Sequence, residues 1–190
     1  MGRIVVSEFV TVDGYMQDPG GAEGLAGGGY AFRFNRGADG DAYKFDELME
    51  AEALLLGRVT YEGFAAAWPG RTDEAGFADR MNGLPKYVVS TTLEQPTWTN
   101  TTVLTGDVAG EVTKLKEQVS GNILVAGSAS LVHALTGLGL VDEYRLMVFP
   151  TMLGTGKRVF ADTDHTADLH LIEARPVGSD GVVVLTYSRR

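Results

Sequence analysis

The segment that most constrains the fold is Asn122–Leu135, NILVAGSASLVHAL. Its apolar run Ile123–Val125 is typical of a strand that is buried on both faces. The small residues Ala126 and Gly127 follow, and apolar residues at helical spacing come after Ser128–Ser130. The pattern predicts a strand, a tight turn and a helix whose first N–H groups suit a phosphate. An ordinary strand-to-helix connection is the alternative, because the full G-x-G-x-x-G fingerprint is absent.

Composition argues against several classes of function. The 190 residues are 44% hydrophobic and 22% charged, which predicts a single domain over residues 1–190. A net charge of −9 argues against nucleic acid or an anionic membrane as the main partner. The absence of cysteine excludes disulfides and thiolate zinc sites. The start of the chain lacks the pattern of a signal peptide, and no segment approaches about 18 apolar residues, so we expect a cytoplasmic protein.

Apolar runs and turn residues predict the other elements. Strands are predicted at Arg3–Val12, Ala53–Leu56, Tyr87–Val89, Thr101–Leu104 and Asp142–Phe149. Helices are predicted after Gly57 and at Asp41–Glu52, Glu74–Asn82 and Asp107–Ser120, with Asp41 and Asp107 as N-caps. The chain ends in two strands, Asp168–Pro176 and Val182–Ser188, joined as a hairpin. The order predicts an α/β fold whose sheet is mostly parallel, with an antiparallel C-terminal edge.

Two further strand ends carry groups that suit a phosphate or a ribose. In Gly57–Thr60 a glycine leads into a helix that offers the Arg58 guanidinium, a hydroxyl and free N–H groups. A solvent-exposed charge is the alternative role for Arg58. Three hydroxyls, Ser90–Thr92, follow another strand. Since ligands of open α/β sheets bind beyond the carboxyl ends of the strands, we expect these groups to meet at one site.

The glycine-rich stretch Pro19–Gly40 is too flexible in composition to form a stable element at low cost. It predicts either a surface loop or a flap over a site, with Tyr30 and Phe32 closing on a ligand. The histidines show no metal-ligand spacing, so no metal site is predicted; they are His133, His165 and His170.

Five segments in matching order resemble the dihydrofolate-reductase-like superfamily. They are VTVDGYM, LLLGRVTYEGF, KYVVSTTL, ILVAGSASLVHAL and DEYRLMVFPTMLGTGKRVF. The branch that looks most similar is the reductase domain of bacterial riboflavin biosynthesis, and the likeness covers nearly the whole chain. This resemblance implies a three-layer dihydrofolate-reductase-like fold and NADPH as the hydride donor.

The resemblance also implies which residues would contact the phosphates and the adenosine. Arg58 and Thr60, which follow Gly57, correspond to the pair that holds the 2′-phosphate and the diphosphate. Ser90 and Thr91 correspond to the hydroxyls near the adenosine and its 2′-phosphate.

The other end of the dinucleotide would lie along a second group of residues. By the same resemblance, Gly127, Ser128 and Ala129 form the turn beneath the diphosphate and the nicotinamide. Phe9 and Met16 fall where the family packs the nicotinamide ring.

Two carboxylates are candidates for a substrate contact or for proton transfer. Asp13 lies in the VDG turn, where the riboflavin branch also has an aspartate. Counting back from Gly57 without gaps puts Asp41 where folate reductases hold their substrate with a carboxylate. Turn geometry for Asp13 and an N-cap for Asp41 are the alternatives. The chain departs from riboflavin-type reductases at Ala126, where they carry an acidic residue, and it lacks the motif of the linked zinc deaminase.

These observations favour an NADPH-dependent reductase of a small heterocyclic substrate, either pterin-like or ribosylaminopyrimidine-like. A non-catalytic module that binds a nucleotide or a flavin on the same fold is the alternative. The resemblance implies a homodimer, and the apolar runs Arg145–Met152 and Val182–Leu185 are consistent with an interface. Helices that cover both faces of these strands would explain the runs without a dimer.

Overall fold

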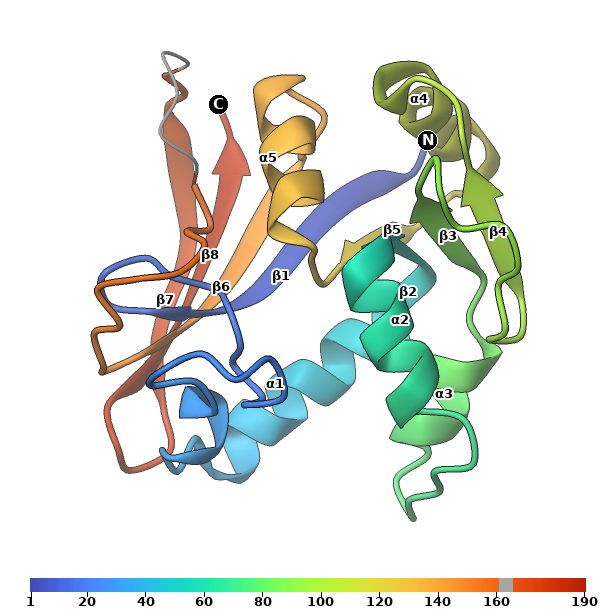
Figure 1. Cartoon of the computed structure of the whole chain (residues 1–190). Coiled ribbons are helices and arrows are strands. Elements are labelled where there is room, and N and C mark those ends of the chain that lie inside the picture. Colours follow the sequence, from blue (N-terminus) through green and yellow to red (C-terminus); the bar gives the residue numbers. More distant parts are fainter. Residues whose placement is uncertain (161–165) are drawn as a thin grey trace.

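The computed structural model describes residues 1–160 and 166–190, and its centre is an eight-stranded sheet. The strand order is β4-β3-β2-β5-β1-β6-β8-β7 (Figure 1). The strands are β1 (Arg3–Thr11), β2 (Ala51–Gly57), β3 (Lys86–Val89), β4 (Thr101–Leu104), β5 (Asn122–Val125), β6 (Glu143–Phe149), β7 (Leu169–Val177) and β8 (Val182–Arg189). Pairing is parallel from β4 to β6 and antiparallel for β8 and β7. The predicted mostly parallel sheet with an antiparallel C-terminal edge is confirmed.

The helices follow the predicted order with shifted ends. They are η1 (Tyr30–Phe32), α1 (Gly37–Glu50), α2 (Arg58–Ala67), α3 (Phe77–Gly83), α4 (Val108–Gln118) and α5 (Ala129–Gly137). Asp107 caps α4 as predicted, since its carboxylate accepts from the N–H groups of Ala109 and Gly110. The N-cap prediction for Asp41 is wrong, because α1 begins at Gly37. Within the described ranges, no helix combines the length and the apolar character needed to cross a membrane.

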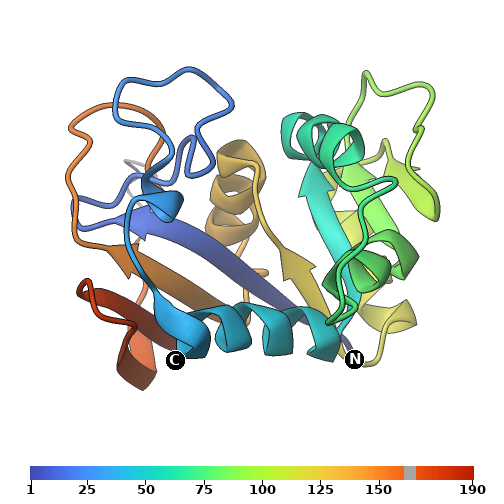
Figure 2. The ribbon, with the colours of Figure 1, turned by 90° about the horizontal axis from the view of Figure 1, so that it is seen from below.

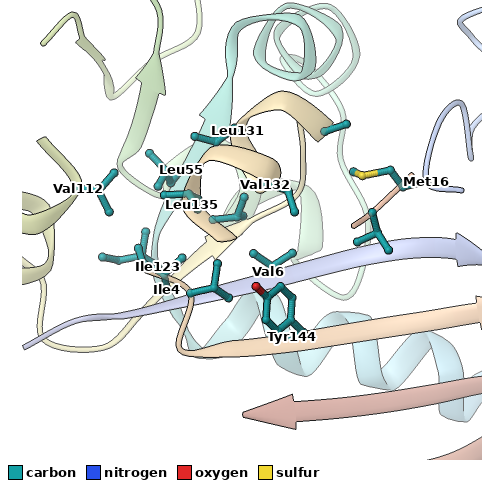
Figure 3. Packing of buried hydrophobic residues seen from close by; sticks show 14 of the residues in the cluster. Ile4, Val6, Met16, Leu55, Val112, Ile123, Leu131, Val132, Leu135 and Tyr144 are labelled. Carbon is teal, nitrogen blue, oxygen red and sulfur yellow. The ribbon is translucent and has the colours of Figure 1, made fainter. Parts of the chain in front are cut away.

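Helices cover both faces of the sheet and give the three predicted layers. On one face α4 and α5 pack on a core cluster that includes Ile4, Leu55 and Leu135, each fully buried (Figure 3). On the other face α1, α2 and α3 pack on a second cluster that includes Val5 and Leu56. Because both faces are covered, the parallel strands are nearly continuous apolar runs.

The loop that follows β1 and the loop that follows β6 lie side by side near the carboxyl end of β1 (Figures 1 and 2). The N–H of Val12 donates to the carbonyl of Thr151 at 3.0 Å, and the N–H of Met16 donates to the carbonyl of Lys157 at 2.9 Å. Tyr30 is fully buried and its hydroxyl donates to the carbonyl oxygen of Phe9 at 2.9 Å. Tyr30 therefore anchors its loop and is not a lid residue, whereas Phe32 is 77% exposed.

The apolar runs behind the predicted homodimer are largely covered within the chain. Val182 and Val184 are fully buried, and Phe149 of β6 is buried as well. Met152, at the end of the first run, is 76% exposed. Two further aliphatic residues are exposed next to each other on the edge strand β7, where Leu171 is 47% and Ile172 is 54% exposed. The homodimer stays a prediction, and these two residues move its expected interface to the β7 edge.

Light scattering at micromolar concentration tests the homodimer. We expect a mass near twice the 20.3 kDa of one chain. Ile172→Lys should then give the mass of one chain, because a charge at an apolar interface is costly to bury. An unmutated protein that keeps the mass of one chain at tenfold higher concentration would contradict the prediction.

Candidate functional site

A cleft of about 310 Å³ opens at the carboxyl ends of β2, β3 and β5. Its polar lining comes from Gly57 and Arg58 after β2, from Ser90–Thr92 after β3, and from Ser128 and Ser130 after β5. Three segments that are far apart in the sequence therefore meet at one place. A cavity of this size suits part of a small-molecule ligand.

Two helices begin at this cleft without a side-chain cap. Gly57 is the N-cap of α2 and Ser128 is the N-cap of α5, and neither helix start has a side-chain cap hydrogen bond. The Ser128 hydroxyl is paired instead with the hydroxyl of Ser130 at 2.9 Å. By contrast, α4 is capped by Asp107. Uncapped N–H groups and two helix dipoles give the cleft a positive potential that favours an anion.

The two turns beneath these helices are in close contact through glycines. The N–H of Gly57 donates to the carbonyl of Gly127 at 3.2 Å. A Cβ on Gly57 would lie 3.0 Å from the backbone nitrogen of Ser128, and a Cβ on Gly127 would lie 2.7 Å from Thr60 Oγ1. Gly127 has φ of +90°, and its peptide bond to Ser128 is cis. Gly57 therefore requires glycine because the backbone of Ser128 is close, and Gly127 requires it for its positive φ and for the close Thr60 side chain.

Arg58 lies at the mouth of the cleft with its side chain 42% exposed. Its Nη1 donates to both carboxylate oxygens of Glu62, one turn along α2, at 2.9 Å. An exposed pair at this helical spacing is worth only about 0.3–0.5 kcal/mol. A bidentate phosphate pair is stronger, so Arg58 can leave Glu62 for a phosphate at low cost.

Ser90 is buried, and its Oγ accepts from the N–H groups of Thr92 at 3.1 Å and Leu93 at 3.0 Å. The Ser90 hydroxyl also lies 3.5 Å from Thr92 Oγ1, where either hydroxyl could donate, and its proton could be donated to a ligand oxygen in place of this long contact. Thr91 is exposed next to it. This is the geometry expected of a ribose or phosphate contact, although hydroxyls that only form turns have the same local bonds.

Five of the predicted cofactor residues do not line the cleft: Phe9, Met16, Thr60, Gly127 and Ala129. Thr60 lies in α2 against Gly127, and Ala129 is buried as the first residue of α5. Phe9 and Met16 lie in different apolar clusters: Phe9 stacks edge-on against Phe149, whereas Met16 packs in the cluster beneath α5 (Figure 3). The structure therefore does not bring Phe9 and Met16 together as one face.

The two predicted carboxylates have local partners. Asp13 accepts from Thr11 Oγ1 at 2.5 Å and from the N–H groups of Leu153 and Gly154 at 3.1 and 2.8 Å. Although burial raises it, these hydrogen bonds hold the pKa of Asp13 below its ordinary value. Asp41 is 65% exposed and accepts from Arg36 Nε at 2.6 Å. Asp13 therefore stabilises a turn in its ionised form. An ionised carboxylate has no proton to donate, so Asp13 is a poor candidate for the proton donor.

A buried carboxylate, Glu8, was not predicted from the sequence. It lies in β1 and is only 8% exposed, and its Oε1 has no hydrogen-bond partner among the residues that the structure describes. Lys44 of α1 lies close by and was missed as well, with its Nζ 2.6 Å from Ser7 Oγ. The sequence did hold a signal for a buried carboxylate: Glu8 lies within a strand rich in β-branched residues, and such strands are buried on both faces.

The described residues hold no cluster of three histidine, cysteine, aspartate or glutamate side chains that suits a metal ion. His133 Nε2 lies 2.8 Å from the carbonyl oxygen of Arg158, and His165 falls outside the described residues.

Comparison with known families matches residues 3–183 to the RibD C-terminal domain. Among curated proteins, the uncharacterized protein YyaP of Bacillus subtilis (strain 168) is 30% identical over 189 residues. That match covers 97% of this chain and 94% of YyaP.

Solved structures show the same fold. A Shewanella sp. PV-4 protein named for riboflavin biosynthesis has a TM-score of 0.76 at 19% identity, with 99% of each chain covered. Dihydrofolate reductase from Enterococcus faecalis, solved with NADP(H), has a TM-score of 0.62 at 14% identity, covering 99% of this chain and 96% of that one. The predicted dihydrofolate-reductase-like fold is therefore confirmed.

Proposed function

Because the chain belongs to the RibD C-terminal domain family, we propose that it is an NADPH-dependent reductase of a small heterocyclic substrate. The substrate is pterin-like or resembles a ribosylaminopyrimidine. The observation that carries the proposal is the convergence of two uncapped helix N-termini with Arg58 on one cleft. The family's link to riboflavin biosynthesis and the fold shared with an NADP(H)-bound reductase support it.

The residues of the cleft fit a phosphorylated dinucleotide. Arg58 would hold the 2′-phosphate, with hydroxyls of Ser90 and Thr91 beside it. The open N–H groups at the starts of α2 and α5 would hold the diphosphate. The glycine contact between Gly57 and Gly127 leaves the backbone bare at this place, where side chains would keep a diphosphate away.

NADPH, when bound, supplies the hydride. The contribution of the chain is to fix the orientation of the two reactants and to exclude water. The rigid ends of β2, β3 and β5 suit that task, since they belong to the buried core of the sheet.

Isothermal titration calorimetry with NADPH and NADH tests the cofactor. We expect NADPH to bind more tightly by about 10- to 100-fold, because a charge-assisted phosphate pair is worth about 1.5–3 kcal/mol. Arg58→Ala should remove most of that preference. Glu62→Gln should strengthen NADPH binding slightly, since it removes the competing carboxylate of the Arg58 pair. Arg71→Ala, which changes the net charge equally outside the cleft, is the matched control and should bind like the unmutated protein.

Equal affinity of the unmutated protein for the two cofactors would overturn the assignment of Arg58. The reaction itself is tested by NADPH oxidation with a panel of pterins, pyrimidines and quinones. Tight NADPH binding without oxidation by any of them would favour the non-catalytic nucleotide-binding module. A flavin spectrum of the purified protein would favour the flavin-binding alternative.

A further inference from the structure

The sheet splits beside the second half of β1. β1 pairs with β5 only from Arg3↔Asn122 to Val6↔Val125, whereas its pairing with β6 continues to Thr11↔Phe149. β5 then turns away into Gly127 and α5, and the two strands diverge (Figure 2). Glu8 is the second residue of β1 beyond the last pair with β5, so it lies at the split.

Glu8 lies on the same face of β1 as Val6 and Val10, which pack in the cluster beneath α5. Ser7 lies on the other face, where Lys44 Nζ donates to its Oγ at 2.6 Å, and the Tyr30 hydroxyl donates to the backbone carbonyl of Phe9 at 2.9 Å. Lys44 is paired in turn with the buried Glu47 at 2.6 Å. Lys44 and Glu47 act on the Glu8 carboxyl through their charges, and neither is a hydrogen-bond partner of its buried Oε1.

One oxygen of Glu8 has no partner within residues 1–160 and 166–190, although it is buried. An unsatisfied buried polar atom is costly, so it indicates a place that a ligand or a bound proton completes. Burial raises the pKa of Glu8 to about 8, and the repulsion from Glu47 adds to this. The attraction of Lys44 and a backbone hydrogen bond from Gly127 oppose the rise. At neutral pH the side chain is therefore mainly a carboxylic acid.

We propose that Glu8 is the proton donor of the reductase reaction and that it ionises when the oxidised dinucleotide replaces the reduced one. The inference rests on the proposed function and narrows its substrate to rings with a C=N bond. The ring carbon accepts the hydride with its two electrons from the reduced cofactor, and the ring nitrogen accepts the proton of Glu8. The C–H bond of the reduced cofactor, the C=N π bond and the Glu8 O–H bond would break, and C–H and N–H bonds would form on the ring. The cofactor would be oxidised and the ring reduced by two electrons, and a solvent proton would restore the acid.

Glu8 suits this role better than the carboxylates predicted from the sequence. Asp13 is held as an anion by hydrogen bonds, and Asp41 is exposed on α1 with Arg36. Glu8 instead contacts Gly127, which belongs to the turn that links the cleft to β5. An acid whose pKa lies near the working pH donates a proton and recovers it efficiently.

Calorimetry of cofactor binding in Mops and in Tris, two buffers of different ionisation enthalpy, tests the proposal without a substrate. At pH 7 we expect NADP⁺ to release close to one proton more than NADPH. The 2′-phosphate is common to both, so its protons cancel in the difference. As the pH rises toward the pKa of Glu8, the affinity for NADP⁺ relative to that for NADPH should increase about tenfold per pH unit. Glu8→Gln should abolish both effects, and Glu50→Gln, a charge-matched change on α1, should keep them.

The protonated carboxyl band in the infrared difference spectrum of the unmutated protein gives the same information if Glu8→Gln fails to fold. NADP⁺ should remove this band and NADPH should keep it. With any panel ring that the protein reduces, Glu8→Gln should lower kcat by about 10²–10⁴-fold and flatten its pH profile.

Equal proton release by the two cofactors, or a difference that survives in Glu8→Gln, would overturn the role of Glu8 alone. Absence of NADPH binding, or reduction of no ring, would remove the proposed function and the proton donor together.

Discussion

The free energy of unfolding should fall as the pH rises from about 5 to 8, by roughly 1.4 kcal/mol per pH unit at most. The cause is Glu8, whose pKa burial raises from 4.5 to about 8. Between these values the folded chain holds a proton that the unfolded chain has lost. The stabilisation by this proton is fully present below the pKa that Glu8 has in the unfolded chain. It is lost as the pH rises through the pKa that Glu8 has in the folded chain. Above about pH 8 the loss should level off.

Urea denaturation of the unmutated protein and of Glu8→Gln at a series of pH values measures this effect. Glu8→Gln should lose the slope in this window, because an amide does not titrate. Asp13, whose pKa the structure lowers, acts only at acid pH, where its stabilising hydrogen bonds are lost as it becomes protonated. Glu50→Gln is the control and should keep the slope. Parallel curves for the unmutated protein and Glu8→Gln would show that Glu8 ionises in the folded chain at its ordinary pKa.

Elements with a strong local pattern could be predicted from the sequence. The segment Asn122–Leu135 forms a strand, a turn and a helix as its apolar spacing predicts. Asp107 caps α4 because a short carboxylate before an apolar stripe is a local signal. The meeting of Gly57 and Ser128 at one cleft follows from a general property of parallel sheets, whose carboxyl ends share one edge.

The error at Asp41 also has a local cause. The helix starts four residues earlier than predicted, at Gly37, whose N–H donates to the side chain of Asn35 at 2.9 Å. Gly37 and Gly40 are weak helix formers, so the sequence gives no clear start signal there. The packing of α1 on the sheet overrides this low propensity.

The surroundings of Glu8 could not be predicted from local patterns. Its environment depends on Lys44 lying against Ser7 across 37 residues of chain, and on where β5 leaves β1. Neither the crossing of α1 over β1 nor the length of the β1–β5 pairing has a signature in a single sequence. Asp13 and Asp41 could therefore be proposed from local sequence patterns, whereas the buried Glu8 could not.

The last expected result is that Gly57→Ala weakens both folding and cofactor binding. A Cβ at this position would lie 2.9 Å from Ser128 Cβ and 3.0 Å from Ser128 N. Real Cβ atoms essentially never lie within 3.0 Å of another heavy atom, so Ser128 must shift, and the β5–α5 turn moves with it. Overpacking of this kind costs about 1–3 kcal/mol of stability.

The same shift should open the cleft, because Gly57 and Ser128 provide the N-caps of the two helices that line it. We expect NADPH affinity to fall by about 10-fold or more, since a movement of this order separates the two sets of N–H donors from one diphosphate. Thermal denaturation and calorimetry measure the two effects separately.

Gly63→Ala is the matched control, since Gly63 lies in the same helix α2 and a Cβ there meets nothing within 4 Å. It should keep NADPH affinity and raise stability by up to about 1 kcal/mol, because alanine favours a helix over glycine. If Gly57→Ala loses stability but binds NADPH as tightly as Gly63→Ala does, the turn contact is only structural. In that case the diphosphate does not lie between the starts of α2 and α5.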